Sequence, residues 1–318
     1  MRCVILFRTH IWDDFTLRQY MRLPKSDSFD SVILANNTDG LCPPVENLPF
    51  VIFTTDDLLK MGLESGPDKN MVWWNADYPL YYYSSLFPNY DYYILCEYDV
   101  FINCDLEKII KSISTEKKDI IALTSFASLE DCIYLQSADG VYPYENIRKT
   151  YFPFAIFSKK SIDFLYERRL VLSKHYREKK IYNWPHCELF VGTEIHASNL
   201  DVVQLTAYGK ADYFSHYPPI LEENIFYLRE QNYIHPVLDS KRFLTSTIHY
   251  EGRPERFFNP FSTFHKTLRH YPFSFYVDPL RKALLTRFYR IANSIKKSLL
   301  KKLLAPKMIK PKKGSQHV

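Results

Sequence analysis

Short runs of apolar residues, separated by stretches with helical spacing, fill the first half of the chain. Each run is apolar almost without interruption, as in strands that are buried on both faces. We expect strands at residues 4–7, 31–35, 50–53, 92–96 and 119–123. Between them the pattern predicts helices at residues 15–23, from about 58 onward, and 76–87. Such alternation is typical of a mostly parallel α/β sheet with helices on both faces.

The second half of the chain has a weaker pattern. A further strand is predicted at residues 152–157, followed by helices at 160–172 and 188–197. Residues 213–273 are rich in proline, histidine and aromatic residues and show little periodicity, so loops and short strands are expected there. We therefore place one large folded domain at residues 1–275.

The end of the chain, residues 276–318, has a different pattern. Apolar residues recur there at spacings of three and four, at Leu280, Leu284, Phe288, Ile291, Ile295, Leu299 and Leu303. Lysines and arginines lie between them, which predicts a basic amphipathic helix. A helix of this kind can lie on an anionic membrane surface, or it can pack on the folded domain and leave its basic face in water.

Charge is distributed unevenly along the 318 residues. The net charge is +5, but the chain from Pro279 onward contains no Asp or Glu and holds 12 of the 41 Lys and Arg residues. The rest of the chain has 29 basic against 36 acidic residues and is mildly acidic. This balance argues against a nucleic-acid partner, because a basic surface that would contact phosphates is missing from the body.

Cysteine spacing and hydropathy indicate a chain that stays in the cytoplasm. The six cysteines form no CxxC pair, which disfavours a zinc site and a disulfide framework and suits free thiols in a reducing compartment. No window approaches 18 consecutive apolar residues, and the apolar run at the N-terminus is too short for a signal peptide. The 25 tyrosines and 23 phenylalanines suit an aromatic-walled cleft.

The most informative segment is NYDYYILCEYDVF, residues 89–101, in which an apolar strand runs into Glu97 and Asp99. Strand side chains alternate between faces, so these two carboxylates point the same way and Tyr98 points the opposite way. Open α/β sheets bind ligands at the carboxyl ends of their strands. Carboxylate oxygens there suit Mg²⁺ or Mn²⁺ shared with substrate phosphates. The alternative is a pair that only caps the following turn.

At this motif the chain resembles glycosyltransferases of the GT-A fold, a Rossmann-like α/β fold whose hallmark is two Asp separated by one residue after a central strand. Glu97-Tyr98-Asp99 is an acidic variant, and the approach through Tyr90-Asp91-Tyr92-Tyr93 is similar to bacterial members. The resemblance covers roughly residues 1–250. It implies a nucleotide-sugar donor in residues 1–110 and an acceptor in 111–275. It also implies that Asp99 ligates a metal and that Glu97 contacts the ribose, or the metal through water.

The resemblance further implies donor contacts at the carboxyl ends of the first strands. The residues in those places, each of which also suits a cap or a turn, are Arg8, Thr9, His10, Asn36, Asn37, Asp56 and Asp57. Asn75 and Asp77 enter the helix before the acidic motif and are further candidates for ribose or sugar contact.

An acid that opens a helix beside the sugar is the general base of inverting GT-A members. Glu188 has that place after Trp184-Pro185-His186-Cys187, with Glu194 as the alternate, and His186 is a candidate acceptor contact. A helix N-terminus helps to keep an acid ionised, although a first-turn Glu can also serve the helix dipole alone. If no base lies there, a retaining mechanism becomes possible.

Many GT-A enzymes supply a late histidine as another metal ligand. His235 fits that place in chain order, with His249 as the alternate, and a neutral imidazole would leave other positions open for diphosphate oxygens. Lys241 and Arg242 are candidates for neutralising the departing diphosphate. A histidine in a loop that only makes surface hydrogen bonds is the alternative.

The implied reaction is displacement at the anomeric carbon of a nucleotide-linked sugar. With the basic tail, it suggests a glycan or lipid-linked acceptor at the inner membrane face, as in bacterial surface polysaccharide or lipopolysaccharide synthesis. A nucleotidyltransferase and a non-catalytic glycan-binding protein are the alternatives. The former usually has a Gly-rich loop near its first strand, which Arg8-Thr9-His10 lacks. Carboxylates neutralised by buried arginines would contradict the enzyme hypothesis.

Overall fold

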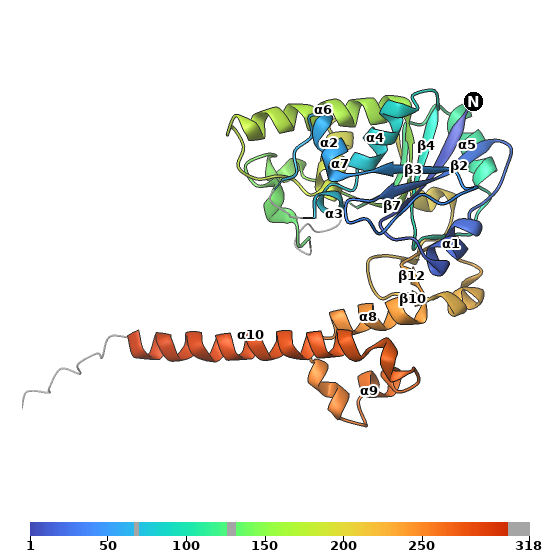
Figure 1. The fold of residues 1–318 in the computed structure, drawn as a ribbon. Coiled ribbons are helices and arrows are strands. Elements are labelled where there is room, and N and C mark those ends of the chain that lie inside the picture. Colours follow the sequence, from blue (N-terminus) through green and yellow to red (C-terminus); the bar gives the residue numbers. More distant parts are fainter. Residues whose placement is uncertain (67–69, 126–131, 305–318) are drawn as a thin grey trace, which may run out of the picture. The chain divides into compact units, whose positions relative to one another are not determined.

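The computed structural model of the protein describes residues 1–66, 70–125 and 132–304 (Figure 1). Contacts divide the chain into two compact units, Met1–Val237 and Leu238–Val318. The charge pattern alone suggests a boundary at residue 275, because it registers the basic tail but not the packing of the chain before it. Residues 305–318 of the predicted tail lie outside the described residues.

A seven-stranded sheet forms the centre of the first unit. Its strands are β1 (Cys3–Thr9), β2 (Phe29–Asn36), β3 (Phe50–Phe53), β4 (Tyr92–Glu97), β6 (Ile120–Ser125), β7 (Lys149–Ser158) and β8 (Val202–Gln204). They lie in the order β3-β2-β1-β4-β7-β6-β8, and neighbours are parallel except that β7 is antiparallel to β4 and β6. The predicted mostly parallel α/β sheet is therefore confirmed.

Side chains alternate between the two faces of this sheet and enter two separate cores. Along β1, Val4 and Leu6 enter one core, and Ile5 and Phe7 enter the other. The helices that pack on the first face are α2 (Thr55–Lys60), α3 (Met71–Trp74), α4 (Tyr78–Leu86), α6 (Lys159–Arg177) and α7 (Cys187–His196). Those on the second face are α1 (Asp14–Met21) and α5 (Leu106–Thr115). Helices thus cover both faces, as expected (Figure 1).

A smaller three-stranded sheet begins directly after β4. Its first strand, β5 (Phe101–Ile102), is antiparallel to β11 (Tyr233–His235), and β11 is parallel to β9 (Tyr213–Phe214). This pairing returns a late segment of the chain to the acidic motif. The other short strands are β10 (Ile220–Leu221) and β12 (Val237–Leu238). Connections contain the short 3₁₀ helices η2 (Leu135–Ala138), η3 (Tyr144–Asn146), η4 (Leu205–Tyr208) and η5 (Glu222–Leu228).

The second unit is helical and has its own small core. Its elements are α8 (Ser240–Tyr250), η6 (Pro254–Phe258), α9 (Thr263–Leu268), η7 (Phe273–Phe275) and α10 (Val277–Leu304). Leu244, Phe264 and Leu280 are among the residues that fill the core. The prediction of loops and short strands over residues 213–273 is therefore wrong for α8 and α9, whose apolar positions are few and depend on packing against α10 for their burial.

Helix α10 confirms the predicted amphipathic helix, but its apolar stripe is divided. Leu280 is buried and Leu284 packs on the core of the second unit, whereas Phe288, Ile291 and Ile295 are exposed by 66%, 43% and 55%. The first half of the stripe therefore holds the helix to its unit, whereas Phe288, Ile291 and Ile295 are not part of that core. Side chains are described up to Ser298, so those of Leu299 and Leu303 lie outside this account. Within the described residues, no helix is long and apolar enough to span a bilayer.

Candidate active site

The two acids of the motif are held by a turn at the end of β4. Glu97 is the last residue of that strand, and its carbonyl accepts a hydrogen bond from the Val100 N–H at 3.0 Å. The Tyr98 N–H donates to the carbonyl of Arg8 on β1, also at 3.0 Å. The turn, rather than strand alternation, brings the carboxylates of Glu97 and Asp99 to the same side. The predicted convergence is thus observed, by a different geometry.

His235 reaches the same place from the end of β11. Pairing of β11 with β5 sets its register, and the Val237 N–H donates to the Asp99 carbonyl at 2.7 Å. His235 Nε2 lies 3.4 Å from Asp99 Oδ1. Within the described residues, Glu97, Asp99 and His235 form a group in which one candidate ligand atom from each lies within 4.8 Å of the others.

Hydrogen bonds orient the His235 ring. Nδ1 lies 2.8 Å from the Ser215 carbonyl and 2.7 Å from the Tyr151 hydroxyl on β7. A carbonyl oxygen only accepts, so Nδ1 carries the proton and Nε2 faces Asp99. Burial alone would lower the pKa of His235, but the charges of Asp99 and Glu97 and the bond to Ser215 raise it. The raised pKa favours the protonated ring, with Nε2–H toward Asp99. A metal ion would replace that proton and bind the lone pair of Nε2.

The donor set fits a divalent cation. Among the described residues, Asp99 Oδ1 is buried and receives no hydrogen bond. A buried carboxylate oxygen without a partner is costly unless a ligand satisfies it. Two carboxylates and an imidazole suit Mg²⁺ or Mn²⁺, which take oxygen ligands and tolerate one nitrogen.

Arg8 places a positive charge beside this group. It forms an ion pair with Glu97 and donates a hydrogen bond to the Ala76 carbonyl at 3.0 Å. The Arg8 and Glu97 side chains keep 15% and 22% of their surface exposed, so this is not a buried neutralisation of the motif. Asp99 is not engaged by Arg8, which leaves its charge for a cation.

A cleft of about 520 Å³ opens at the carboxyl ends of β1, β2 and β4. The predicted donor contacts in its wall are Arg8, Thr9, His10 and Asn36, together with Glu97 and Asp99. Thr38, Thr55 and Trp73 also line it and were not predicted. Hydroxyl, amide and guanidinium groups therefore surround the candidate cation site.

The other residues expected near the second and third strands serve as caps. Asn37 accepts a hydrogen bond from the Cys42 N–H at 2.9 Å. Asp57 pairs with Thr54 in the capping box of α2, and Asp56 is exposed in the first turn of that helix. Lys241, Arg242 and His249 belong to the second unit, where Arg242 forms an ion pair with Asp239. A diphosphate contact for Lys241 and Arg242 stays a prediction.

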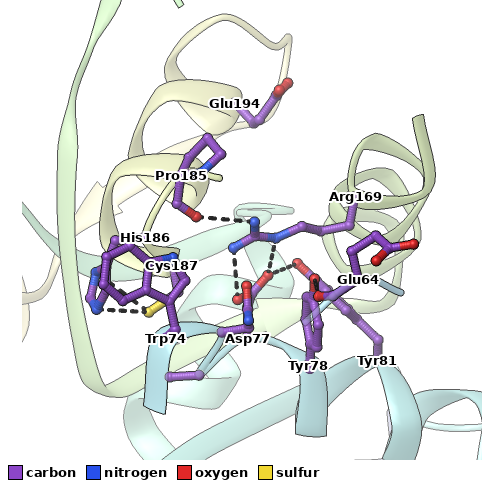
Figure 2. A network of polar contacts seen from close by, with 12 residues as sticks. Glu64, Trp74, Asp77, Tyr78, Tyr81, Arg169, Pro185, His186, Cys187 and Glu194 are labelled. Atoms are coloured by element: carbon purple, nitrogen blue, oxygen red, sulfur yellow. Dashed lines mark hydrogen bonds and ion pairs between the residues drawn. The ribbon is translucent and has the colours of Figure 1, made fainter. Parts of the chain in front are cut away.

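Asn75 and Asp77 are buried and are not among the residues that line the cleft. Both contact the segment that leads into α7, and Figure 2 shows the contacts of Asp77. Asp77 accepts two hydrogen bonds from Arg169, at 2.8 and 3.1 Å, and Arg169 Nη1 donates to the Pro185 carbonyl at 3.2 Å. Asn75 Oδ1 accepts from Trp184 Nε1 at 2.8 Å. The structure therefore places these predicted sugar contacts in the buried scaffold that supports the segment before α7.

Glu188 lies in the first turn of α7, directly after this anchored segment. Its carboxylate is 3.2 Å from Lys149 Nζ on β7. Burial raises the pKa of Glu188, Lys149 opposes the rise, and Glu97 and His235 act on it through their charges. The side chain is therefore electrostatically coupled to the candidate cation group.

The alternates near Glu188 have other partners. Glu194 is buried, accepts from Arg168 Nε at 2.7 Å and accepts from the Tyr142 hydroxyl at 2.8 Å. His186 is buried and stacks on Tyr134 with ring centroids 3.8 Å apart. Burial lowers the pKa of His186 to about 3, so its ring is neutral. Glu194 and His186 are therefore engaged elsewhere. Glu188 is not among the residues that line the cleft, and its connection to the candidate cation group is through charge.

Sequence reasoning missed Lys149, Tyr151 and His216. Burial lowers the pKa of His216, and the charges of Lys149 and His235 lower it further, which places it near both. Lys149 and Tyr151 lie in the first residues of β7, whereas the apolar pattern predicted that this strand begins at residue 152. Their polar side chains alternate with buried ones at the start of β7, and this alternation was the available signal.

No protein-family model matches the sequence, and no curated protein matches it. Among solved structures, a glycosyltransferase involved in glycosylation of the major capsid of PBCV-1 is similar at 10% identity and a TM-score of 0.37, covering 74% of this chain and 93% of that one. Mouse xyloside xylosyltransferase 1 is similar at 8% identity and a TM-score of 0.40, covering 74% and 96%. The galactosyltransferase LgtC is similar at 10% identity and a TM-score of 0.36, covering 72% and 78%.

Proposed function

We propose that this chain is a metal-dependent glycosyltransferase that moves a sugar from a nucleotide-sugar donor to a glycan or lipid-linked acceptor. The observation that carries the proposal is the group of Glu97, Asp99 and His235 beside a polar cleft at the carboxyl ends of the parallel strands. Asp99 Oδ1 in this group is buried and lacks a hydrogen bond within the described residues. A cation that grips a diphosphate accounts for both features.

Different residues of the cleft would bind the cation, the diphosphate and the ribose of a nucleotide sugar. Asp99 and His235, with Glu97, would hold Mn²⁺ or Mg²⁺, which supplies charge neutralisation for a leaving diphosphate. Arg8, oriented by Glu97, adds a second positive charge to the same side of the cleft. Asn36 lies in the wall and would supply its amide to a ribose. Thr9 supports the wall instead, because its hydroxyl is buried and donates to the Ile11 carbonyl at 2.6 Å.

Glu188 is the proposed general base. Its carboxylate would take the proton of the acceptor hydroxyl as the acceptor oxygen bonds to the anomeric carbon and the bond to the diphosphate oxygen breaks. This path inverts the anomeric carbon. Lys149 favours the ionised form that a base needs. Retention would require the acceptor to bind where Glu188 cannot reach its hydroxyl.

Calorimetry with Mn²⁺ and a nucleoside diphosphate tests the cation site directly. In the Asp99→Asn variant we expect affinity to fall by about a hundredfold or more, since even outer contacts of a metal ligand are worth 10–100-fold. Asp163→Asn, which alters an exposed acid on α6, should bind like wild type. Hydrolysis of common nucleotide sugars should fall in parallel in Asp99→Asn. Equal binding and turnover by both variants would refute the proposal, and glycan binding that ignores Mn²⁺ and nucleotide would favour a lectin-like protein.

We also propose that the enzyme works at the inner face of the membrane, in bacterial surface polysaccharide or lipopolysaccharide synthesis. The support comes from α10, in which Phe288, Ile291 and Ile295 are exposed. Arg290 lies between the first two, and Lys296 and Lys297 directly follow the third. An exposed apolar stripe with basic flanks suits anionic lipid headgroups. A lipid-linked acceptor would be found at that surface.

A further inference from the structure

Trp73 places a large aromatic ring in a cleft wall that also holds hydroxyl, amide and charged groups. It lies on α3, lines the cleft and keeps 50% of its surface exposed. The other cleft residues described above offer hydroxyls, amides and charges. A half-exposed indole among such groups has lost part of its hydration without gaining an apolar neighbour on its open side. Its exposure is therefore a feature that the fold alone leaves unexplained.

Neighbouring rings fix the position of this indole without stacking on it. Trp74, Tyr134 and His186 approach with centroid separations of 6.2, 5.6 and 5.5 Å and interplanar angles of 57°, 77° and 65°. By contrast, Tyr134 and His186 stack on each other at 12°. Within the described residues no ring lies parallel to Trp73. Edge contacts therefore hold the Trp73 side chain in place, while its exposed part stays available to a ligand.

Trp73 lies near both the candidate diphosphate site and the candidate base. Trp73 shares the cleft wall with Asp99, which would hold the diphosphate through a cation. It also contacts His186, the N-cap residue of α7, two residues before Glu188. The sugar that is transferred must lie between the diphosphate and the base. Trp73 is linked to both groups, to Asp99 because both line the cleft and to Glu188 through the contact with His186.

A pyranose ring has the chemistry that matches such a surface. One of its faces exposes mostly C–H groups, which pack on the electron-rich face of an indole, while its hydroxyls reach polar groups at the rim. The polar residues around Trp73 supply such partners. A nucleobase could also stack on an indole, but a base lies on the far side of the diphosphate from the reacting sugar.

We infer that Trp73 is a stacking platform for the sugar ring of the donor, and so a residue that selects the donor sugar. The inference rests on the proposed function. It predicts that the indole contributes to binding of the sugar-bearing nucleotide and not to binding of the nucleoside diphosphate alone.

Calorimetry in the presence of Mn²⁺ separates these two contributions. The probes are UDP against UDP-glucose and UDP-galactose, and GDP against GDP-mannose, with the full chain and its Trp73→Ala variant. For the donor that wild type prefers, we expect roughly tenfold weaker binding to the variant, since an aromatic contact and its buried area are worth about 1–2 kcal/mol. The matching nucleoside diphosphate should bind within about twofold of wild type. Trp73→Phe should retain most of the donor affinity.

Controls distinguish this platform from a general loss of structure. Tyr182→Ala removes an aromatic ring that is 82% exposed and outside the cleft lining, and it should leave both affinities unchanged. The change in indole fluorescence on adding the donor should disappear in Trp73→Phe and persist in Trp12→Phe, because Trp12 packs against Phe7 and Phe50 instead.

The outcomes separate the inference from the proposed function. If Trp73→Ala weakens binding of the nucleoside diphosphate as much as binding of the donor, or weakens neither, the stacking platform is refuted while the transferase proposal stands. If wild type binds none of these nucleotides with Mn²⁺, the proposed function fails and the platform fails with it.

Discussion

Lys149 and Glu188 are the pair of residues that sets the protonation of the candidate base. Burial favours the neutral acid, and the ammonium group 3.2 Å away favours the carboxylate. The charge of Glu97 adds to the effect of burial, whereas His235 opposes it. Because the pKa is raised on balance, Glu188 becomes a competent base only above a pH that lies higher than for an ordinary glutamate.

Lys149→Met should move the acid limb of the pH–rate profile to higher pH. Loss of the ammonium group raises the pKa of Glu188 further, so less carboxylate is present at a given pH. A displacement of about one pH unit is the expected scale for one close charge. The measurement is donor turnover against pH with and without acceptor. Lys180→Met, which alters an exposed ion pair with Glu178, should keep the wild-type profile. An unmoved limb in Lys149→Met would exclude Glu188 as the base.

The buried pair of Asp77 and Arg169 joins three elements. Asp77 precedes α4, Arg169 lies on α6, and the carbonyl that Arg169 binds belongs to Pro185 before α7 (Figure 2). Arg169 also lies over the Phe190 ring, 3.7 Å from its centroid. Because both charged side chains are almost completely buried, each depends on the other for its solvation.

Asp77→Ala should destabilise the first unit by about 3–5 kcal/mol, because it leaves the Arg169 charge buried without its partner. Urea unfolding measures the loss. The matched control is Asp163→Ala, which removes an exposed ion pair with Lys159 on α6 and should cost less than about 1 kcal/mol. A loss in Asp77→Ala as small as in the control would show that water reaches Arg169 in the folded protein.

Asp119 joins the strands at the other side of the sheet. It accepts hydrogen bonds from Lys160 Nζ at 2.8 Å, from the Ser158 hydroxyl at 3.1 Å and from the Asp201 N–H at 3.0 Å. Burial alone would raise the pKa of Asp119, but these three donors outweigh it and the pKa is lowered. The carboxylate is therefore favoured in the folded state.

The stability that Asp119 contributes should be lost in acid. Its folded pKa lies below the unfolded value of about 3.9, so the contribution is complete above that value and disappears as pH falls through the folded pKa. Asp119→Asn should lower the free energy of unfolding by about 1–3 kcal/mol at pH 7. The difference from wild type should shrink as the pH drops below about 4. A difference that is independent of pH would mean that the charge is not what stabilises this junction.

At the scale of the whole molecule, the chain combines an α/β unit with a helical unit that carries the exposed stripe of α10. Leu280 belongs to the core of the second unit, so deleting the chain from residue 279 would disrupt that core. Substitutions beyond Arg287 change the exposed stripe and leave the core intact. They are therefore the better probe of membrane contact.

Full-length protein should sediment with vesicles that contain anionic phosphatidylglycerol, and less with vesicles of phosphatidylcholine alone. Arg290→Gln, Lys296→Gln and Lys297→Gln together should weaken binding by about 3 kcal/mol, near 1 kcal/mol for each charge. Phe288→Ser with Ile295→Ser should weaken it on both kinds of vesicle. Exposed Lys111→Gln on α5 is the control. Sedimentation that is equal for all variants would exclude α10 as the membrane contact.

Features that depend on local pattern could be predicted from the sequence. The strands of the sheet are continuous apolar runs, and the acidic motif follows one of them, so the fold class and the position of Glu97 and Asp99 were accessible. The antiparallel direction of β7 could not be predicted from hydropathy, because a strand that is buried on both faces has the same apolar pattern in either direction.

Features that depend on tertiary packing could not. Asn75 and Asp77 have the polarity of ligand contacts, and only the positions of Trp184 and Arg169 reveal that they are buried scaffold. Lys149 is a single polar residue at the start of a strand, which has no distinctive spacing. Its importance follows from the proximity of Glu188, a residue far along the chain.

The pairing of β5 with β11 fastens the two halves of the cation site together independently of the chain that joins them. Between Asp99 and His235 lie surface turns, such as those around Tyr144 and Tyr182, which are 59% and 82% exposed. Lengthening or exchanging such turns leaves the register of the site intact. Evolution, or a protein engineer, can therefore vary these turns while retaining the arrangement of Glu97, Asp99 and His235.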